Sequence, residues 1–263
     1  MTLHELSSGE TGAVPVVLLH GFPLDHRMWL DVAAALPPGR RVLAADLPGS
    51  AGGGDDLPEP SLEASADQVA RELAAAGTGP AVVVGLSMGG YVALALAERH
   101  PAVVVALGLV DTKSTADSDE ARANRLRIAR EAEAGDTVEP VRPMATTLVG
   151  ETTRALGPAT SERIAVWIDG QSPAGVAWSQ RAMAARPDRT RVLHAFAGPV
   201  TVVVGDEDTL TPAAEAEHMA AAAADAHLVV VPHAGHMSAV EQPGAVAAAL
   251  ADLAQRADRA ARP

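Results

Sequence analysis

The stretch GLSMGG at residues 85–90 decides how this chain folds. It follows the apolar run AVVV at 81–84 and precedes YVALALAER at 91–99, which is typical of a helix. We therefore predict a strand, a very tight turn and a helix, with Ser87 at the apex. The glycines beside the serine let strand and helix approach without side-chain clashes. Because the flanks are not polar and aperiodic, as they would be around a spectator serine, we interpret Ser87 as a catalytic nucleophile.

A serine nucleophile needs a base that accepts its proton. Near the C-terminal end, HLVVV at 227–231 predicts a strand that runs into the loop PHAGHM at 232–237. This loop contains two histidines, His233 and His236. On chemistry alone, either of them could reach a serine.

The base in turn needs a carboxylate that orients it. The run VTVVV at 200–204 predicts another buried strand, and the acidic turn GDEDTLTP follows it at 205–212. Asp206, Glu207 and Asp208 all stand at the carboxyl end of that strand. The residues alone leave the choice among these three open.

The order serine, acid, histidine along the chain is the order of the α/β-hydrolase arrangement. The chain resembles this family over nearly its whole length, at LHGFP (19–23), DLPG (46–49), GLSMGG, GDEDTLTP and residues 233–243. Two further stretches, HGFPLDHRMW at 20–29 and AARPD at 184–188, are similar to small esterases of the 3-oxoadipate enol-lactonase type. The resemblance implies a mainly parallel sheet flanked by helices, with an inserted helical cap. It also implies a cofactor-independent serine hydrolase that cleaves a small carboxylic ester or lactone through an acyl-enzyme.

The resemblance also selects among the open alternatives. The family's acid stands three residues after the glycine, which favours Asp208 over Asp206, and its base ends an H-x-x-G-H-like turn, which favours His236 over His233. The backbone N–H groups of Phe22 and Met88 are the expected donors of an oxyanion hole. Asp206 then becomes a turn-stabilising or helix-capping carboxylate.

Composition limits the remaining possibilities. With 263 residues, 48% of them hydrophobic, the chain is long enough for one α/β domain with an insertion. It contains no cysteine, which excludes a disulfide framework, a thiolate nucleophile and a cysteine-ligated zinc site. The nine histidines form no H-E-x-x-H pattern, so we expect neither a metal nor another cofactor.

The formal net charge of −13 disfavours nucleic acid and anionic membranes as partners. The N-terminal sequence MTLHEL lacks a basic segment followed by an apolar one, and no run approaches the length needed to span a bilayer. We therefore expect a cytoplasmic protein whose partner is a small-molecule ester or lactone. The sequence does not indicate an oligomeric state.

Residues 112–190 interrupt the alternation of strands and helices. Four helical stretches are predicted there, at 117–133, 138–149, 152–168 and 172–184. We interpret 112–190 as a helical cap inserted into a core formed by residues 1–111 and 191–263. In the family that the chain resembles, such a cap shapes the substrate pocket.

Candidate pocket residues come from two groups. Aromatic residues make up only 2% of the chain, so the large rings of Trp29, Trp167 and Trp178 either line a pocket or pack helices together. The first cap helix carries a cluster of arginines that either recognises a carboxylate or forms a solvated face: Arg122, Arg125, Arg127 and Arg130.

At the N-terminal end, only residues 3–7 precede the predicted turn at 9–12, so the sheet is expected to be one edge strand short of the family pattern. Three other functions remain open. A C–C bond hydrolase or a perhydrolase of the haloperoxidase type would use the same three residues, and a non-catalytic binding protein on the hydrolase fold would use none. Epoxide hydrolases and haloalkane dehalogenases place an aspartate where Ser87 stands, which argues against those activities.

Overall fold

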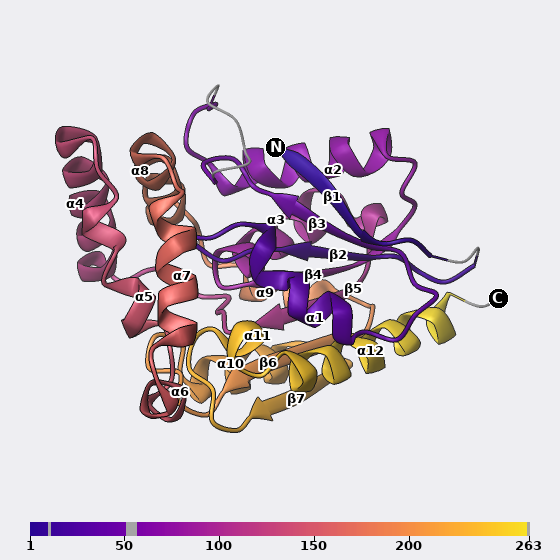
Figure 1. Ribbon diagram of the computed structural model, residues 1–263. Helices are drawn as coiled ribbons and strands as arrows, with labels where there is room; N and C mark the ends of the chain where they lie inside the picture. The colour runs from indigo at the N-terminus through magenta and orange to yellow at the C-terminus, as the bar shows by residue number, and fades with distance from the viewer. Residues whose placement is uncertain (10–11, 51–56, 262–263) are drawn as a thin grey trace.

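The computed structural model describes residues 1–9, 12–50 and 57–261. Within these ranges one sheet of seven strands has the order β1-β3-β2-β4-β5-β6-β7 (Figure 1). The strands are β1 Thr2–Ser7, β2 Val16–Leu19, β3 Val42–Asp46, β4 Ala81–Leu86, β5 Val104–Val110, β6 Val200–Gly205 and β7 Ala226–Val231. All neighbouring strands are parallel except the pair of β1 and β3, which is antiparallel. The fold is thus the predicted α/β sheet.

The central strands are continuous apolar runs because both faces of the sheet are covered by helices. Every residue of β2, β3, β4 and β6 is buried. α12 and α1 cover one face, and α2, α3, α9 and α10 cover the other (Figure 1). The bounds of these helices are α1 Leu30–Ala35, α2 Leu62–Ala75, α3 Met88–Arg99, α9 Thr190–Ala195, α10 Ala213–Ala222 and α12 Pro243–Ala260. α11, Ser238–Glu241, and the 3-10 turns η1, His26–Trp29, and η2, Pro101–Val103, complete this part.

Between β5 and β6 the chain forms a group of helices beyond one end of the sheet (Figure 1). They are α4 Asp119–Gly135, η3 Glu139–Val141, α5 Met144–Thr147, α6 Glu151–Leu156, α7 Ala159–Asp169 and α8 Pro173–Ala184. The single helix predicted at 152–168 is wrong, because Gly157 adopts φ 130° and Pro158 lacks an amide hydrogen, so α6 ends there and α7 begins. The helix predicted at 138–149 is also wrong: it is two short turns, η3 and α5.

At the N-terminal edge one strand, β1, pairs with β3. The predicted turn at 9–12 includes residues 10–11, which lie outside the described residues. Across the described ranges, no helix combines the length and apolar character that a membrane crossing requires.

Candidate active site

Ser87 stands at the turn between β4 and α3. Its backbone has φ 50° and ψ −113°, a conformation that is strained for a residue with a side chain. The turn is possible because glycines surround it: a Cβ on Gly85 would lie 2.1 Å from the carbonyl oxygen of Gly89, and one on Gly90 would lie 2.5 Å from Thr112 Oγ1. The strand therefore packs directly on the helix, and the serine side chain is held at the end of the sheet.

His236 and Asp208 reach this serine from the loops after β7 and β6. His236 Nε2 lies 2.9 Å from Ser87 Oγ, and His236 Nδ1 lies 2.8 Å from Asp208 Oδ2. All three residues are buried. Carboxylate, imidazole and hydroxyl thus form a continuous hydrogen-bonded chain, the geometry in which an imidazole can accept a serine proton.

Hydrogen bonds hold the carboxylate in place. Thr211 Oγ1 donates to Asp208 Oδ2 at 2.7 Å, and the backbone amides of Leu210 and Thr211 donate to Oδ1 at 2.8 and 3.0 Å. Burial by itself raises the pKa of Asp208, but the hydrogen bond and charge of His236 and the bonds from Thr211 outweigh it and bring the pKa below its usual value. Asp208 is therefore ionised at neutral pH.

The pKa of His236 is raised, whereas that of Asp208 is lowered. Burial lowers the pKa of His236, yet the hydrogen bond to Asp208 and the negative charges of Asp208 and Asp111 outweigh burial and raise it. A raised pKa makes His236 a stronger base toward the serine hydroxyl.

The alternative residues lie elsewhere. Asp206 is exposed and its Oδ1 is 3.4 Å from the amide of Ala234. Glu207 accepts hydrogen bonds from the amide and hydroxyl of Thr152, at the start of α6. His233 is exposed and adopts φ 60°. Of the three carboxylates and two histidines that the sequence left open, the structure brings Asp208 and His236 together with Ser87.

Two backbone amides near Ser87 have no partner within the described part of the chain. No hydrogen bond is recorded there from the N–H of Phe22 or of Met88. Phe22 belongs to the loop after β2, and Met88 is the first residue of α3. His20 holds the loop of Phe22 in place. Its Nε2 accepts a hydrogen bond from the amide of Leu47 at 3.0 Å, and its Nδ1 lies 3.0 Å from the carbonyl oxygen of Gly21. Burial lowers the pKa of His20, so its ring stays neutral.

A cavity of about 180 Å³ opens onto Ser87 and His236. Its apolar wall consists of Phe22, Tyr91, Ala121, Met144, Met183 and Leu210. Its polar wall consists of Lys113, Asp117, Arg125 and Thr211. Two larger cavities, of about 270 and 460 Å³, are lined by neither Ser87 nor His236. Volume alone therefore does not single out the cavity at Ser87.

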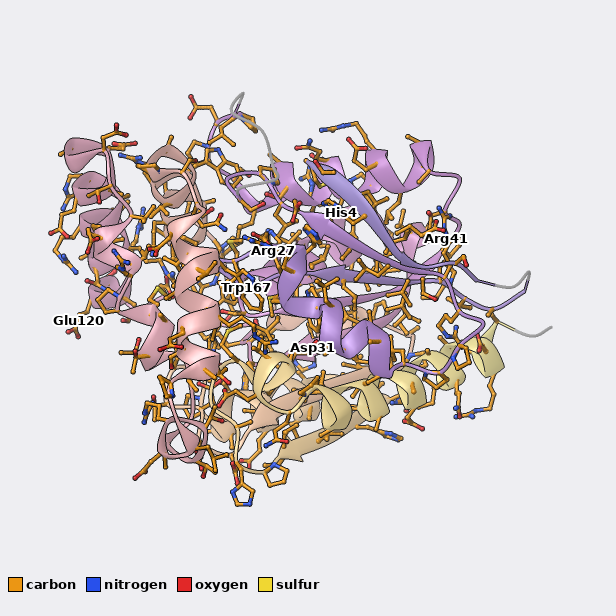
Figure 2. The ribbon with its side chains drawn as sticks, in the orientation of Figure 1. His4, Arg27, Asp31, Arg41, Glu120 and Trp167 are labelled. Atoms are coloured by element: carbon orange, nitrogen blue, oxygen red, sulfur yellow. The ribbon has the colours of Figure 1, made fainter. Side chains whose placement is uncertain are left out.

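The sequence predicted that the three tryptophans line the substrate pocket. None of them lines the cavity at Ser87. Trp29 is fully buried in the core. Trp167, labelled in Figure 2, lies on α7 under the guanidinium of Arg163. Trp178 donates its Nε1 hydrogen to the carbonyl of Pro58 at 2.5 Å. All three tryptophans are buried.

The four arginines of α4 do not act as one cluster. Arg125 lines the cavity, whereas Arg122, Arg127 and Arg130 are exposed, and Arg127 pairs with Glu131 at 2.6 Å. The outer face of α4, where Figure 2 labels Glu120, points away from the sheet. Of the two alternatives that the sequence left open, the solvated face fits Arg122, Arg127 and Arg130, because a helix turns its side chains to different faces.

Sequence reasoning missed Asp111, Lys113, Thr211 and His20. Asp111 and Lys113 belong to the stretch VDTK at 110–113, directly after β5. Ends of parallel strands meet at one edge of the sheet, and ligands bind there in α/β folds. That signal could have identified both residues.

Among the described residues, one group of side chains has the composition of a metal site: His4, His26 and Asp46. His4, labelled in Figure 2 on β1, has its Nε2 2.6 Å from Asp46 Oδ2, and His26 Nδ1 lies 2.9 Å from Oδ1. Their rings stack at 3.6 Å. These are hydrogen-bond distances, so the carboxylate serves as acceptor for both rings.

Comparison with known proteins places the chain in a family. The family model described as "alpha/beta hydrolase fold" matches residues 14–243. The chain is 30% identical over 259 residues to a 2-succinyl-6-hydroxy-2,4-cyclohexadiene-1-carboxylate synthase from an Enterobacter species, covering 94% of this chain and 93% of that protein. The chain therefore belongs to the α/β-hydrolase family.

Two solved structures narrow this class. An esterase from Thermogutta terrifontis, described as malate bound, is 36% identical with a TM-score of 0.87, over 97% of this chain and 93% of that chain. An enol-lactonase from Burkholderia xenovorans is 26% identical with a TM-score of 0.82, over 95% of both chains. A pimeloyl-[acyl-carrier protein] methyl ester esterase from Aromatoleum aromaticum is 44% identical, but the match spans only 36% of its length. The chain is therefore an esterase-like member of the α/β-hydrolase family.

Proposed function

We propose that the protein cleaves a small carboxylic ester or lactone through an acyl-enzyme on Ser87. His236 Nε2 accepts the proton as Ser87 Oγ attacks the carbonyl carbon, and Asp208 orients the ring and stabilises the imidazolium. His236 then gives the proton to the leaving alkoxide, and the acyl group stays on the serine. A water molecule, activated by the same imidazole, attacks the acyl-enzyme and releases the acid.

The observation that supports this mechanism most directly is the pair of distances at His236, 2.9 Å to Ser87 Oγ and 2.8 Å to Asp208 Oδ2. The unpartnered amides of Phe22 and Met88 support a second element, an oxyanion hole for the tetrahedral intermediate. Losing one donor of this kind typically reduces the rate by about 10²–10³.

Residues 112–190 serve in this proposal as the cap over the site, on a core of residues 1–111 and 191–263. Side chains of α4, α5 and α8 support this role, because Arg125, Met144 and Met183 line the same cavity as Ser87. The cap would set which acyl or alcohol group fits.

The test is hydrolysis of p-nitrophenyl esters from acetate to octanoate, combined with labelling by a fluorophosphonate probe, in the wild type and in Ser87→Ala. We expect turnover and labelling in the wild type, and loss of labelling with a fall in kcat of about 10⁴ or more in the variant. Full activity in Ser87→Ala would contradict the acyl-enzyme. Labelling without ester turnover would favour a C–C bond hydrolase or perhydrolase, and neither labelling nor turnover would favour a binding protein.

A further inference from the structure

The cavity at Ser87 contains more positive than negative charge. Lys113, Arg125 and Arg186 surround one carboxylate, Asp117, whose side chain is only 3% exposed. Arg125 Nε lies 2.6 Å from Asp117 Oδ2, and Arg186 Nη2 lies 2.8 Å from Oδ1. Of these four side chains, Lys113, Arg125 and Asp117 line the cavity, so its wall carries two cations and one anion there.

The two arginines satisfy this carboxylate without the lysine. Each of them donates to a different oxygen of Asp117 at hydrogen-bond distance. Arg186 is also fixed from other sides, because it lies over the Tyr91 ring at 4.0 Å and donates to the carbonyl of Met183 at 3.1 Å. Arg186 and Asp117 are therefore part of the packing, and Arg186 does not line the cavity.

Lys113 is in a different situation. Its side chain is 19% exposed and lines the cavity with Ser87 and His236. Its Nζ is 3.7 Å from Asp117 Oδ1, too far for a hydrogen bond, and no hydrogen bond from it is recorded within the described ranges. A largely buried ammonium group with three donors and no acceptor is costly unless a ligand supplies one.

Arg125 offers a second donor beside it. Its Nη1 makes only long contacts, 3.3 Å to Gln180 Oε1 and 3.3 Å to Met183 Sδ. The apolar side chains of Met144, Met183 and Leu210 line the same cavity. A short hydrocarbon segment fits these apolar side chains, and an anionic group fits the two cations.

We propose that Lys113, with Arg125, binds a carboxylate carried by the substrate, so that the preferred substrate is a small ester or lactone with a free carboxylate a few bonds from the scissile carbonyl. This inference rests on the proposed function and specifies its substrate class. The cavity of about 180 Å³ limits such a substrate to a small molecule. Lys113 determines specificity, while Ser87 and His236 perform the chemistry.

The test compares anionic esters with neutral isosteres by pH-stat. Monomethyl succinate is paired with methyl 4-methylpentanoate, and acetoxyacetate with isobutyl acetate, so that the carboxylate stands on the acyl side in one pair and on the alcohol side in the other. We expect the wild type to prefer the anion in at least one pair. Lys113→Met should lower that preference in kcat/KM by about 10- to 100-fold, the size of a charged hydrogen bond, and Lys113→Arg should keep most of it.

Arg127→Met is the matched control, because Arg127 lies on α4 like Arg125 but is exposed and pairs with Glu131. It should leave the preference unchanged. A wild type without preference in either pair, or a preference that Lys113→Met retains, overturns the proposal. Hydrolysis of these esters together with fluorophosphonate labelling of Ser87 would show that the proposed function still stands.

If no ester is hydrolysed, calorimetry on Ser87→Ala with monomethyl succinate and with acetoxyacetate separates the two ideas. Binding that the added Lys113→Met change weakens at least tenfold supports the carboxylate site while the proposed hydrolysis fails. Absence of binding by both anions overturns the carboxylate site.

Discussion

Asp111 and Ser238 are joined by two hydrogen bonds: Asp111 Oδ2 accepts from the Ser238 amide at 2.9 Å and from its hydroxyl at 2.6 Å. The other oxygen of Asp111 accepts from the amide of Gly205 at 3.0 Å. Asp208 lies three residues after Gly205, and His236 lies two residues before Ser238. One buried carboxylate at the end of β5 thus ties together the two segments that carry the candidate acid and base. Asp111 is a positioning residue.

Its charge also acts on the base. Burial, and then the charge of Asp208, raise the pKa of Asp111 to about 7, against the charge of His236 and the hydrogen bonds from Ser238 and Gly205. When ionised, Asp111 stabilises the imidazolium and raises the pKa of His236. The charges of Asp111 and His236 are coupled, so a pH profile reports the two groups together.

Asp111→Asn should move the acid limb of the kcat/KM profile to lower pH. The base must be neutral to accept the serine proton, and removal of a nearby negative charge makes His236 lose its own proton at lower pH. Asparagine tolerates the φ of 42° at this position but offers one acceptor oxygen instead of two, so we also expect a loss of about 1–3 kcal/mol in the free energy of unfolding. The measurements are pH–rate profiles and urea denaturation.

Ser238→Ala is the control for charge. It removes one hydrogen bond to Asp111 but keeps the carboxylate, so it should cost about 1 kcal/mol and leave the acid limb in place. An acid limb that moves equally in both variants would contradict the role of the Asp111 charge.

The same carboxyl has a consequence for stability. The folded protein holds its proton up to about pH 7, whereas the unfolded chain releases it near 3.8, so the native state binds more protons between these values. The contribution of Asp111 to stability is present below 3.8 and is lost as pH rises through about 7. Between pH 3.8 and about 7, Asp111 makes the free energy of unfolding of the wild type decrease with pH. Asp111→Asn lacks this contribution, so the slope of its free energy of unfolding against pH should be more positive than that of the wild type.

Asp208→Asn should reduce kcat by about 10⁴, because an amide beside Nδ1 can donate to it and hold His236 in the wrong tautomer. Loss of the negative charge also lowers the pKa of His236, which again moves the acid limb to lower pH. Asp206→Asn is the matched control at an exposed carboxylate two residues earlier, and we expect it to change kcat by no more than about twofold. Steady-state kinetics decide between them, and a larger effect at Asp206 would reverse the assignment of the acid.

The strands and the serine turn were predictable because their signals are local. A strand buried on both faces is a continuous apolar run, as β4 and β6 are, and the turn at Ser87 needs glycines within a few residues. The prediction of a single helix at 152–168 was wrong because Gly157 and Pro158 separate α6 from α7. Both residues are local helix-breaking signals that the sequence shows.

The cavity wall was less predictable because it depends on contacts between distant segments. Lys113 and Leu210 follow β5 and β6, whose ends share an edge of the sheet with Ser87, but nothing in the sequence shows that Arg125 of α4 meets them there. The arginines of α4 look alike in sequence, yet the packing of α4 on α8 turns Arg125 toward the cavity and leaves Arg127 exposed.

Gly89→Ala should destabilise the fold and the site together. A Cβ at Gly89 would lie 2.1 Å from the carbonyl oxygen of Leu19 and 2.8 Å from that of His20, and both are backbone atoms that cannot turn aside. α3 would have to move away from the end of β2, which shifts Ser87 relative to the loop of Phe22. We expect a loss of about 3 kcal/mol or more in the free energy of unfolding, together with slower fluorophosphonate labelling.

Gly244→Ala is the matched control, since a Cβ there meets nothing within 4 Å and the residue lies in α12. Alanine loses less backbone entropy than glycine in a helix, so this variant should keep the wild-type labelling rate and gain up to about 1 kcal/mol. Urea denaturation followed by circular dichroism measures both. A Gly89→Ala protein that unfolds at the wild-type midpoint would show that α3 can shift freely, which is incompatible with a serine turn held by glycine-to-backbone contact.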